Sequence, residues 1–213
     1  MTSFWQFVVK HRVEIATLTA EHLWLVVWAM AISLAIGLPL GVMLTRHPKW
    51  RAVVLGTNNV IQVIPSLALF GLLLPVPWLG ARADRLTIVA LALYALLPIV
   101  RNTYTGISGV DPTVLEVATG MGLTPRQVLW NVELPLATPV ILGGVRVATV
   151  ITIGVATIAA AIGAGGLGEF IFRGLAMVDN HVILAGAIPA ALMALAADGA
   201  IGGLQRLLQR PRR

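Results

Sequence analysis

Five long apolar runs constrain the fold of this chain more than any other feature of its sequence. They cover residues 22–44, 53–78, 86–107, 138–164 and 181–208. A helix that crosses a membrane needs about 20 mostly apolar residues, so each run is long enough. Charged residues make up only 11% of the chain, whereas a soluble domain has about 25%. The sequence therefore predicts an all-α integral membrane protein, with about five transmembrane helices in a single domain of residues 1–213.

The second run is the least regular, and the stretch before the first run is amphipathic. Asn58, Asn59, Gln62 and Pro65 interrupt the second run, and proline weakens a helix because it has no N–H to donate. Residues 3–20 combine aromatic and aliphatic side chains with three charged ones. That mixture is typical of a helix lying in the membrane interface. We therefore expect an interfacial helix at 3–20 and not a sixth span.

The distribution of lysine and arginine favours one orientation, because loops that stay in the cytoplasm are enriched in these residues. The C-terminal ends of the first, third and fifth runs lie on the same side of the membrane. That side has nine basic residues: Arg46, Lys49, Arg51, Arg101, Arg126, Arg206, Arg210, Arg212 and Arg213. The other side has five: Lys10, Arg12, Arg82, Arg85 and Arg173. This balance predicts an external N-terminus, a cytoplasmic C-terminus and a cytoplasmic segment at 111–135.

That segment, 111–135, has its own helix signals. Asp111 is followed by Pro112, a sequence that suits the N-cap and first turn of a helix. The glycines at 120 and 122 then allow the chain to turn. A second helix start follows at Thr124, where Pro125 and a glutamine three residues on complete a capping box. We expect this second helix to end at Pro135, because the residue before a proline avoids the helical region.

The helix–turn–helix at 111–135 has two interpretations on physical grounds. It is an ordered loop that caps the bundle, or it is a docking element that fits a groove of a partner protein. The segment contains one arginine and no lysine, so it lacks the basic surface that binds nucleic acid. We therefore expect no nucleic-acid partner.

A family resemblance favours the docking interpretation. Glu116, Val117 and Ala118 are followed at matching spacing by Gly122 and then by the residues 132–135. This arrangement resembles the E-A-A, three residues, G, nine residues, I-x-L-P pattern of the cytoplasmic EAA loop in permease subunits of bacterial ABC importers. Four further stretches are similar to the osmoprotectant branch of that family, which imports glycine betaine, carnitine or choline: "HLWLVVWAMAISLAIGLPLGVMLTR", "IQVIPSLALFGLLLP", "ATIAAAIGAGGLGEFIFRG" and "ILAGAIPAALMALAADG".

The resemblance implies a non-catalytic subunit in the bacterial inner (cytoplasmic) membrane. It implies four kinds of partner: ATP-binding cassette ATPase subunits, a second permease copy or paralogue, an extracytoplasmic substrate-binding protein, and the lipid bilayer. ATP and Mg would be bound by the partner ATPase, and no G-x-x-x-x-G-K-[ST] loop occurs in this chain. The ATPase-coupling residues that it implies are Glu116, Ala118, Gly120, Gly122, Leu123, Thr124, Pro125, Leu134 and Pro135.

A polar stripe interrupts the second run and is a candidate lining for the translocation path. Asn58, Gln62 and Ser66 are spaced by four residues, which places them on one face of a helix, and Asn59 is adjacent. Polar groups are costly in lipid and usually face the interior of a bundle. The alternative is that these groups form hydrogen bonds between helices without lining a path.

Two opposite charges lie inside the last two runs. Arg146 and Asp198 are each about ten residues from the cytoplasmic end of their helices, so their depths agree. A charge buried alone in a membrane is expensive. We therefore predict a structural ion pair, within or between subunits. The chain has no cysteine, and its four histidines lack the spacing of metal ligands, so we expect no metal site and no cofactor in this chain.

The sequence GAGGLG at 163–168 fits a dinucleotide fingerprint but lacks the strand–turn–helix context of one. We expect a flexible turn on the outer face, with a loop at 169–180 that shapes an external gate. Close packing of helices is the alternative.

Three other functions remain open at this stage: a permease of the same build for an amino acid such as methionine, an intramembrane enzyme, and a non-transport membrane scaffold. An enzyme needs paired catalytic groups in the membrane, and Arg146 with Asp198 does not qualify. A scaffold does not need a capped helix pair in water.

Overall fold

The computed structural model describes residues 4–208, which form helices joined by short turns and contain no strand. The helices are α1 (Phe4–Lys10), α2 (Arg12–Arg46), α3 (Pro48–Val63), α4 (Ser66–Leu73), α5 (Pro77–Gly80), α6 (Ala83–Ser108), α7 (Pro112–Gly120), α8 (Pro125–Val128), the π-helix η1 (Leu129–Glu133), α9 (Leu134–Ala156), the 3-10 helix η2 (Thr157–Ile162), α10 (Gly168–Met177) and α11 (Asn180–Leu208). The predicted charges at Arg210, Arg212 and Arg213 and the first residue of the 3–20 helix lie outside the described residues.

Four helical segments are long and apolar enough to cross a membrane: α2, α6, α9 with its helical extensions, and α11. A fifth span is formed if α3 and α4 are taken together, although the two are bent by 104° at their junction. The prediction of an all-α membrane protein with about five spans is therefore confirmed, but the second run is a broken helix.

The break in the second span has a clear cause at Pro65. Proline cannot donate a backbone N–H, and the residue before it, Ile64, has extended geometry with ψ 126°. The carbonyl of Ile64 would otherwise be left without a partner in a membrane. The Tyr94 hydroxyl of α6 donates a hydrogen bond to it, so the break is stabilised by a side chain from the neighbouring span.

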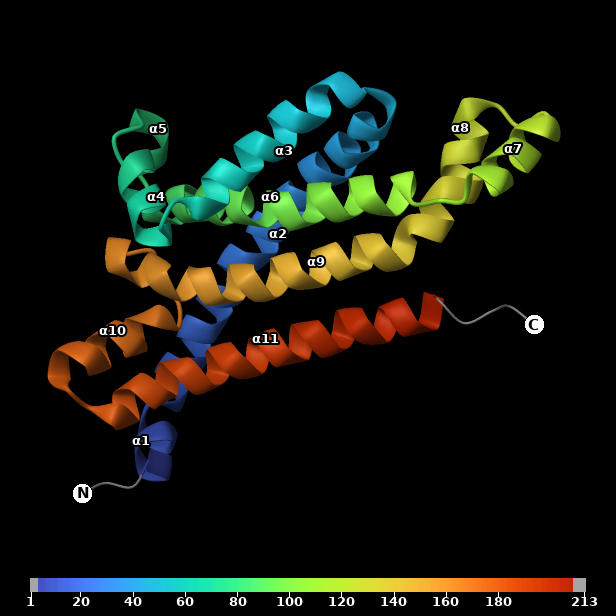
Figure 1. The fold of residues 1–213 in the computed structure, drawn as a ribbon. Helices are drawn as coiled ribbons and strands as arrows, with labels where there is room; N and C mark the ends of the chain where they lie inside the picture. The colour runs from blue at the N-terminus through green and yellow to red at the C-terminus, as the bar shows by residue number, and fades with distance from the viewer. Residues whose placement is uncertain (1–3, 209–213) are drawn as a thin grey trace.

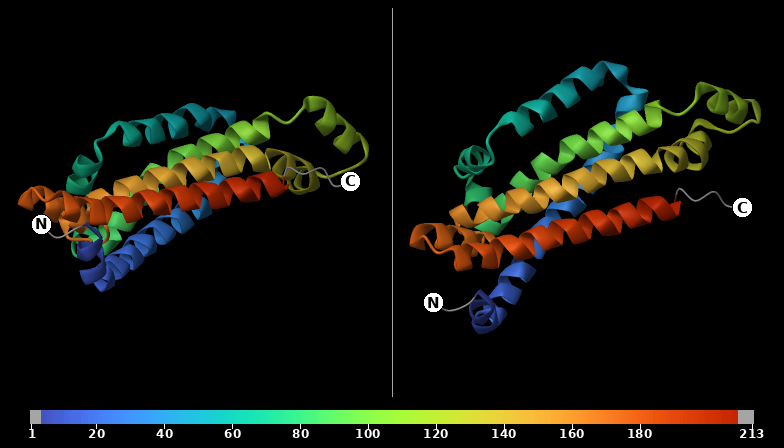
Figure 2. Two further views of the ribbon diagram at one scale, coloured as in Figure 1. Left: turned by 90° about the horizontal axis from the view of Figure 1, so that it is seen from below. Right: turned by 60° about the horizontal axis from the view of Figure 1, so that its bottom comes forward.

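Helix α6 is the centre of the bundle. Of the residues in its most apolar stretch, 61% are buried, against 22% for α11. Leu91, Ala95 and Ile99 of α6 pack with Leu25 of α2 and Ala148 of α9 in the main core. Figure 2 shows α2 and α3 on opposite sides of the layer that α6, α9 and α11 form. The bundle therefore has two different faces, one covered by α2 and the other by α3.

The two ends of the bundle are also different, as Figure 1 shows. One end has the α2–α3 junction, the projecting pair α7–α8 and the last turn of α11. The opposite end has α1, α4, α5 and α10. All helices that connect the two ends must therefore alternate in direction, as a multi-pass membrane protein requires.

The N-terminal segment differs from the prediction of one interfacial helix at 3–20. Helix α1 ends at Lys10, and after His11 the chain enters α2, which is 35 residues long. Residues 12–20 belong to α2, because their side chains make contacts with α10 and α11. Leu18 is buried against α10 and α11, and Glu14 accepts a 2.7 Å hydrogen bond from Arg173. Of the three charges that suggested an interruption, Glu14 is thus paired.

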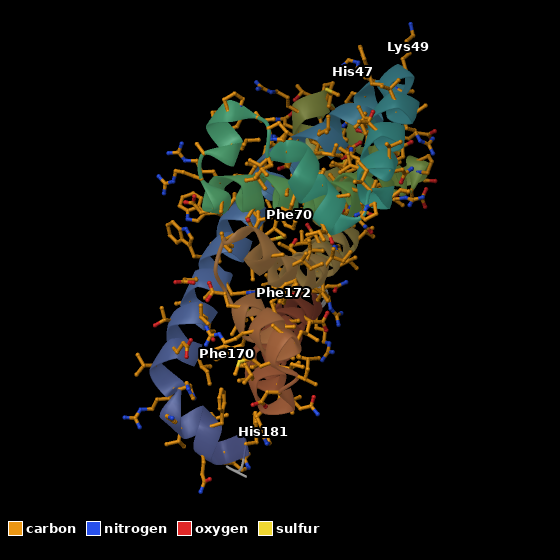
Figure 3. All side chains as sticks on the ribbon, turned by 90° about the vertical axis from the view of Figure 1, so that its left-hand side faces the viewer. His47, Lys49, Phe70, Phe170, Phe172 and His181 are labelled. Atoms are coloured by element: carbon orange, nitrogen blue, oxygen red, sulfur yellow. The ribbon has the colours of Figure 1, made fainter. Side chains whose placement is uncertain are left out.

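Figure 3 looks at this end of the bundle and shows α1 and the start of α2 beside α10 and α11, with Phe170 and His181 labelled. The ring of Phe7 lies edge-on to Phe170 at 6.4 Å, and Phe4 stacks on His181 at 6.3 Å. These aromatic contacts fix α1 against the last two helices.

The glycine-rich turn has the conformation that its sequence suggests, but the segment after it does not. Gly163, Gly165 and Gly166 have positive φ angles of 76°, 80° and 82°, which only glycine adopts readily. The backbone N–H of Gly166 donates a 3.1 Å hydrogen bond to Glu21. The predicted loop at 169–180 is wrong, because most of it is the helix α10, whose Phe170 and Gly174 are buried.

Candidate functional site

The pair α7–α8 projects from one end of the bundle and is built from strong local signals (Figure 1). Asp111 caps α7 by accepting a 2.8 Å hydrogen bond from the N–H of Thr113. Thr124 and Gln127 form a complete capping box at the start of α8. Each start satisfies N–H groups that a helix leaves unpaired. Both predicted helix starts are therefore confirmed.

The turn between α7 and α8 is a helix C-cap that requires glycine at one position only. Gly122 has a φ of 84°. Its N–H bonds to the Thr119 carbonyl, and the N–H of Leu123 bonds to the Ala118 carbonyl at 3.2 Å, the two bonds of a Schellman motif. Gly120 is the last residue of α7 and has open space around it. Of the two predicted turn glycines, Gly122 forms the turn and Gly120 is helical.

The surface of α7 is unusually apolar for a segment that projects from a bundle. Val114, Val117 and Met121 are 41%, 59% and 75% exposed. Their spacing of three and four residues aligns them along one side of the helix. Ala118 of α7 and Val128 of α8 are instead buried. An exposed apolar stripe of this kind is a candidate contact surface for another protein.

Among the other candidates on this segment, Glu116 and the residues around 124 are accessible. The side chain of Glu116 is exposed and has no ion-pair partner within the described range 4–208. Thr124 and Pro125 are exposed, and Leu123 is half-buried. These side chains are therefore available for contacts outside this chain.

The predicted helix end at Pro135 is wrong, because the chain stays helical from Pro125 to Ile162. The five residues Leu129–Glu133 form a π-helix, and the N–H of Leu134 bonds to the carbonyl of Leu129. A proline ring clashes with the carbonyl four residues earlier in an α-helix. The wider π turn just before Pro135 avoids that clash. Helix α8 is thus joined to the span α9 by continuous helix, with no loop between them.

Glu133 in the π turn is a residue that the sequence analysis missed. Its side chain is 4% exposed and pairs with Arg46 at the end of α2, which is 45% exposed. The two residues are 87 positions apart, so no local spacing could have paired them. The one signal in the sequence that could have pointed to Glu133 is its charge, which lies between two apolar neighbours.

The predicted polar stripe is only partly a stripe. Asn58 is buried and donates to the carbonyl of Val54 at 2.9 Å. Gln62 donates to the carbonyl of Tyr94 on α6 at 3.0 Å. Ser66 belongs to α4, beyond the 104° bend, so the expectation that it shares a helix face with the other two is wrong. Asn59 is exposed beside Val60, Val63 and Ile64.

The bend nevertheless brings two of these residues to one hollow. Gln62 and Ser66 both line an open cavity of about 310 Å³, together with Pro65, Tyr94 and two residues of α9, Ile151 and Val155. The cavity lies where α3 and α4 meet α9. Asn58 does not line it, since its amide is turned back to its own helix.

Arg146 of α9 and Asp198 of α11 form the predicted ion pair within one chain. Both nitrogens of the guanidinium fork that face Asp198 donate to its carboxylate. The side chains are 38% and 34% exposed. They line a second hollow of about 480 Å³, in which Ile151 again takes part. The two hollows therefore follow one another along the same face of α9.

A family model for "Binding-protein-dependent transport system inner membrane component" matches residues 37–213. Three curated relatives are similar along most of their length. The choline transport system permease protein OpuBB of Bacillus subtilis strain 168 is 41% identical over 95% of this chain and 92% of its own. The osmoprotectant import permease protein OsmW of Salmonella typhimurium is 45% identical over 91% of each. The carnitine transport permease protein OpuCB of Listeria monocytogenes is 43% identical over 88% and 84%.

Solved structures share the fold at lower sequence identity. A structure of the inward-facing MetNI methionine ABC transporter matches with a TM-score of 0.83 at 21% identity, over 99% of this chain and 100% of that one. An amino acid ABC transporter with histidines matches with a TM-score of 0.79, also at 21% identity, over 97% and 99%. The arrangement of helices seen here is thus one already observed in solved membrane transporters.

Proposed function

The chain belongs to the family of binding-protein-dependent transport system inner membrane components, and on this premise we propose that it is the permease subunit of an ATP-driven importer of quaternary-ammonium osmoprotectants. The substrate is glycine betaine, carnitine or choline. The observation that supports this most directly is 41–45% identity, over nine tenths of the chain, to permeases named for choline and for osmoprotectant import. The amino-acid transporters share only the fold, at 21% identity.

In this proposal the chain does no chemistry of its own. ATP and Mg are bound by a separate ATPase subunit, and a separate extracytoplasmic binding protein delivers the substrate. The pair α7–α8 docks into a groove of the ATPase through the apolar stripe of Val114, Val117 and Met121. The exposure of that stripe supports the assignment, because a helix recognised in a groove presents apolar residues at such a spacing.

The docking role also sets the orientation of the bundle. The end with α7–α8 and the last turn of α11 lies in the cytoplasm, the N-terminus lies outside, and the membrane is the bacterial inner membrane. Arg46, Lys49, Arg51 and Arg206 are at the end assigned to the cytoplasm, as the enrichment of basic residues on that side requires.

The substrate crosses along the face of α9 that has the two hollows. Gln62 and Ser66 line one, and the pair Arg146–Asp198 lines the other. Both hollows are open in a single chain, so a second permease copy or a paralogue completes the path by covering this face. The ion pair holds α9 to α11, and the polar groups of the first hollow contact the substrate.

The test is uptake into proteoliposomes that contain the permease, its co-encoded ATPase and the binding protein. Radiolabelled glycine betaine, carnitine, choline and methionine are offered separately, with ATP or with a non-hydrolysable analogue. We expect ATP-dependent accumulation of at least one quaternary ammonium compound and none of methionine. Accumulation of methionine alone would show that the substrate assignment is wrong. Accumulation without the ATPase would show that a separate ATPase subunit is not needed to drive transport.

A further inference from the structure

Glu133 is the single acidic residue in the buried class within the described residues 4–208. Its side chain is 4% exposed, and its one ion-pair partner is Arg46. A buried carboxylate is strongly unfavourable unless it is paired and hydrogen-bonded. The position of Glu133 therefore depends on Arg46, and the two side chains are held together.

The two partners lie at the ends of two different spans. Arg46 is the last residue of α2, and Glu133 is the last residue of the π turn that joins α8 to α9. Helix α8 begins only eight positions before Glu133, at Pro125. The ion pair thus connects the first span to the place where the docking element enters the bundle.

Between α2 and α9 the packing is incomplete at this end. An apolar groove of about 660 Å³ separates them, lined on one side by Leu38, Val42 and Met43 and on the other by residues such as Trp130 and Leu134. Arg46 follows Met43 by three positions, and Glu133 follows Trp130 by three. Arg46 lies one turn beyond the groove on α2, whereas Glu133 lies between the groove-lining residues Trp130 and Leu134, so the ion pair bridges the two helices at the groove itself.

We infer that Arg46 and Glu133 form a strut that transmits displacement of α7–α8 to α2. The inference rests on the proposed function. Motion of the docking element reaches α9 through the continuous helix from Pro125 to Ile162. It reaches the end of α2 directly through the ion pair, across the groove, whereas the other route is indirect and runs through α6, which packs on both α2 and α9. Both residues are positioning residues: they hold two spans in step and contact neither substrate nor nucleotide.

The experiment measures solute accumulated per ATP hydrolysed, in proteoliposomes of the full complex. The decisive variant is the double substitution Arg46→Met with Glu133→Leu. It removes both charges at once and leaves no buried charge unpaired, so we expect it to assemble as wild type does. We expect it to hydrolyse ATP but to accumulate about tenfold less solute per ATP.

Three further variants separate coupling from folding. Glu133→Gln alone should lower the same ratio, and Arg46→Lys should retain most of it because the charge is kept. Lys49→Gln is the matched control: it removes a positive charge at the same end of the bundle, from a residue with no ion-pair partner among the described ones. We expect the control to behave as wild type.

The outcomes decide between a strut and a purely structural pair. A double variant with the wild-type ratio of solute to ATP would overturn the inference. So would a double variant that fails to assemble, since the pair would then act in folding. Wild-type protein that accumulates no solute at all would instead refute the proposed function, which distinguishes the two failures.

Discussion

Met121, at the turn of the projecting helix pair, gives the most direct test of the docking proposal. Its side chain is 75% exposed, and burying a methionine fully is worth about 1.5–3 kcal/mol. Covering the exposed three quarters in an interface is therefore worth about 1–2 kcal/mol, or roughly five- to thirtyfold in Kd. Met121→Ser should weaken binding of the purified ATPase subunit by that factor, measured by titration of the permease in nanodiscs.

The matched control is Met177→Ser. Met177 is 63% exposed, but it ends α10 at the opposite end of the bundle. The same chemical change should leave the affinity for the ATPase unchanged there. Met121 has φ −75° and ψ 0°, so serine fits its backbone without strain. Equal affinity of the Met121→Ser protein and wild type would refute the docking surface, and so would equal weakening by the control.

Three further predictions concern the turn, the ion pair and the hollow. Gly122→Ala should destabilise the projecting pair by about 1–2 kcal/mol because of its left-handed backbone, while Gly120→Ala, inside α7, should not; hydrogen exchange of the 112–128 amides measures both. Neutralising Arg146 or Asp198 singly should abolish uptake, and exchanging the two residues should restore most of it; an inactive exchange variant would argue against an ion pair. Gln62→Ala should lower uptake without changing assembly on size-exclusion chromatography, and unchanged uptake would remove it from the path.

Features that depend on a few neighbouring residues could be predicted from the sequence. The cap at Asp111, the capping box at Thr124 and the turn at Gly122 are each set by backbone chemistry within four residues. The spans were also predictable, because a run of apolar side chains in a membrane must be helical. The ion pair between Arg146 and Asp198 followed from depth, since two opposite charges at one level in lipid have few other partners.

The errors arose where a distant contact overrode a local signal. Residues 12–20 continue α2 because Glu14 pairs with Arg173 and Leu18 packs against α10 and α11. Both partners are more than 140 positions away in the sequence. Pro135 does not end its helix because the π turn before it accommodates the proline ring. Ser66 does not share a helix face with Asn58 and Gln62, because the chain bends at Ile64. That bend is stabilised by Tyr94, which is 30 positions away.

The π turn has a geometric consequence of its own. An α-helix advances about 100° of rotation per residue, so the one surplus residue in Leu129–Glu133 rotates everything before it by that amount about the axis of α9. The apolar side of the pair α7–α8 therefore points about a quarter-turn away from the direction that an uninterrupted α-helix would give it. The direction from which a neighbouring protein can reach the apolar side of α7 is therefore set by the π-helix of five residues, Leu129–Glu133.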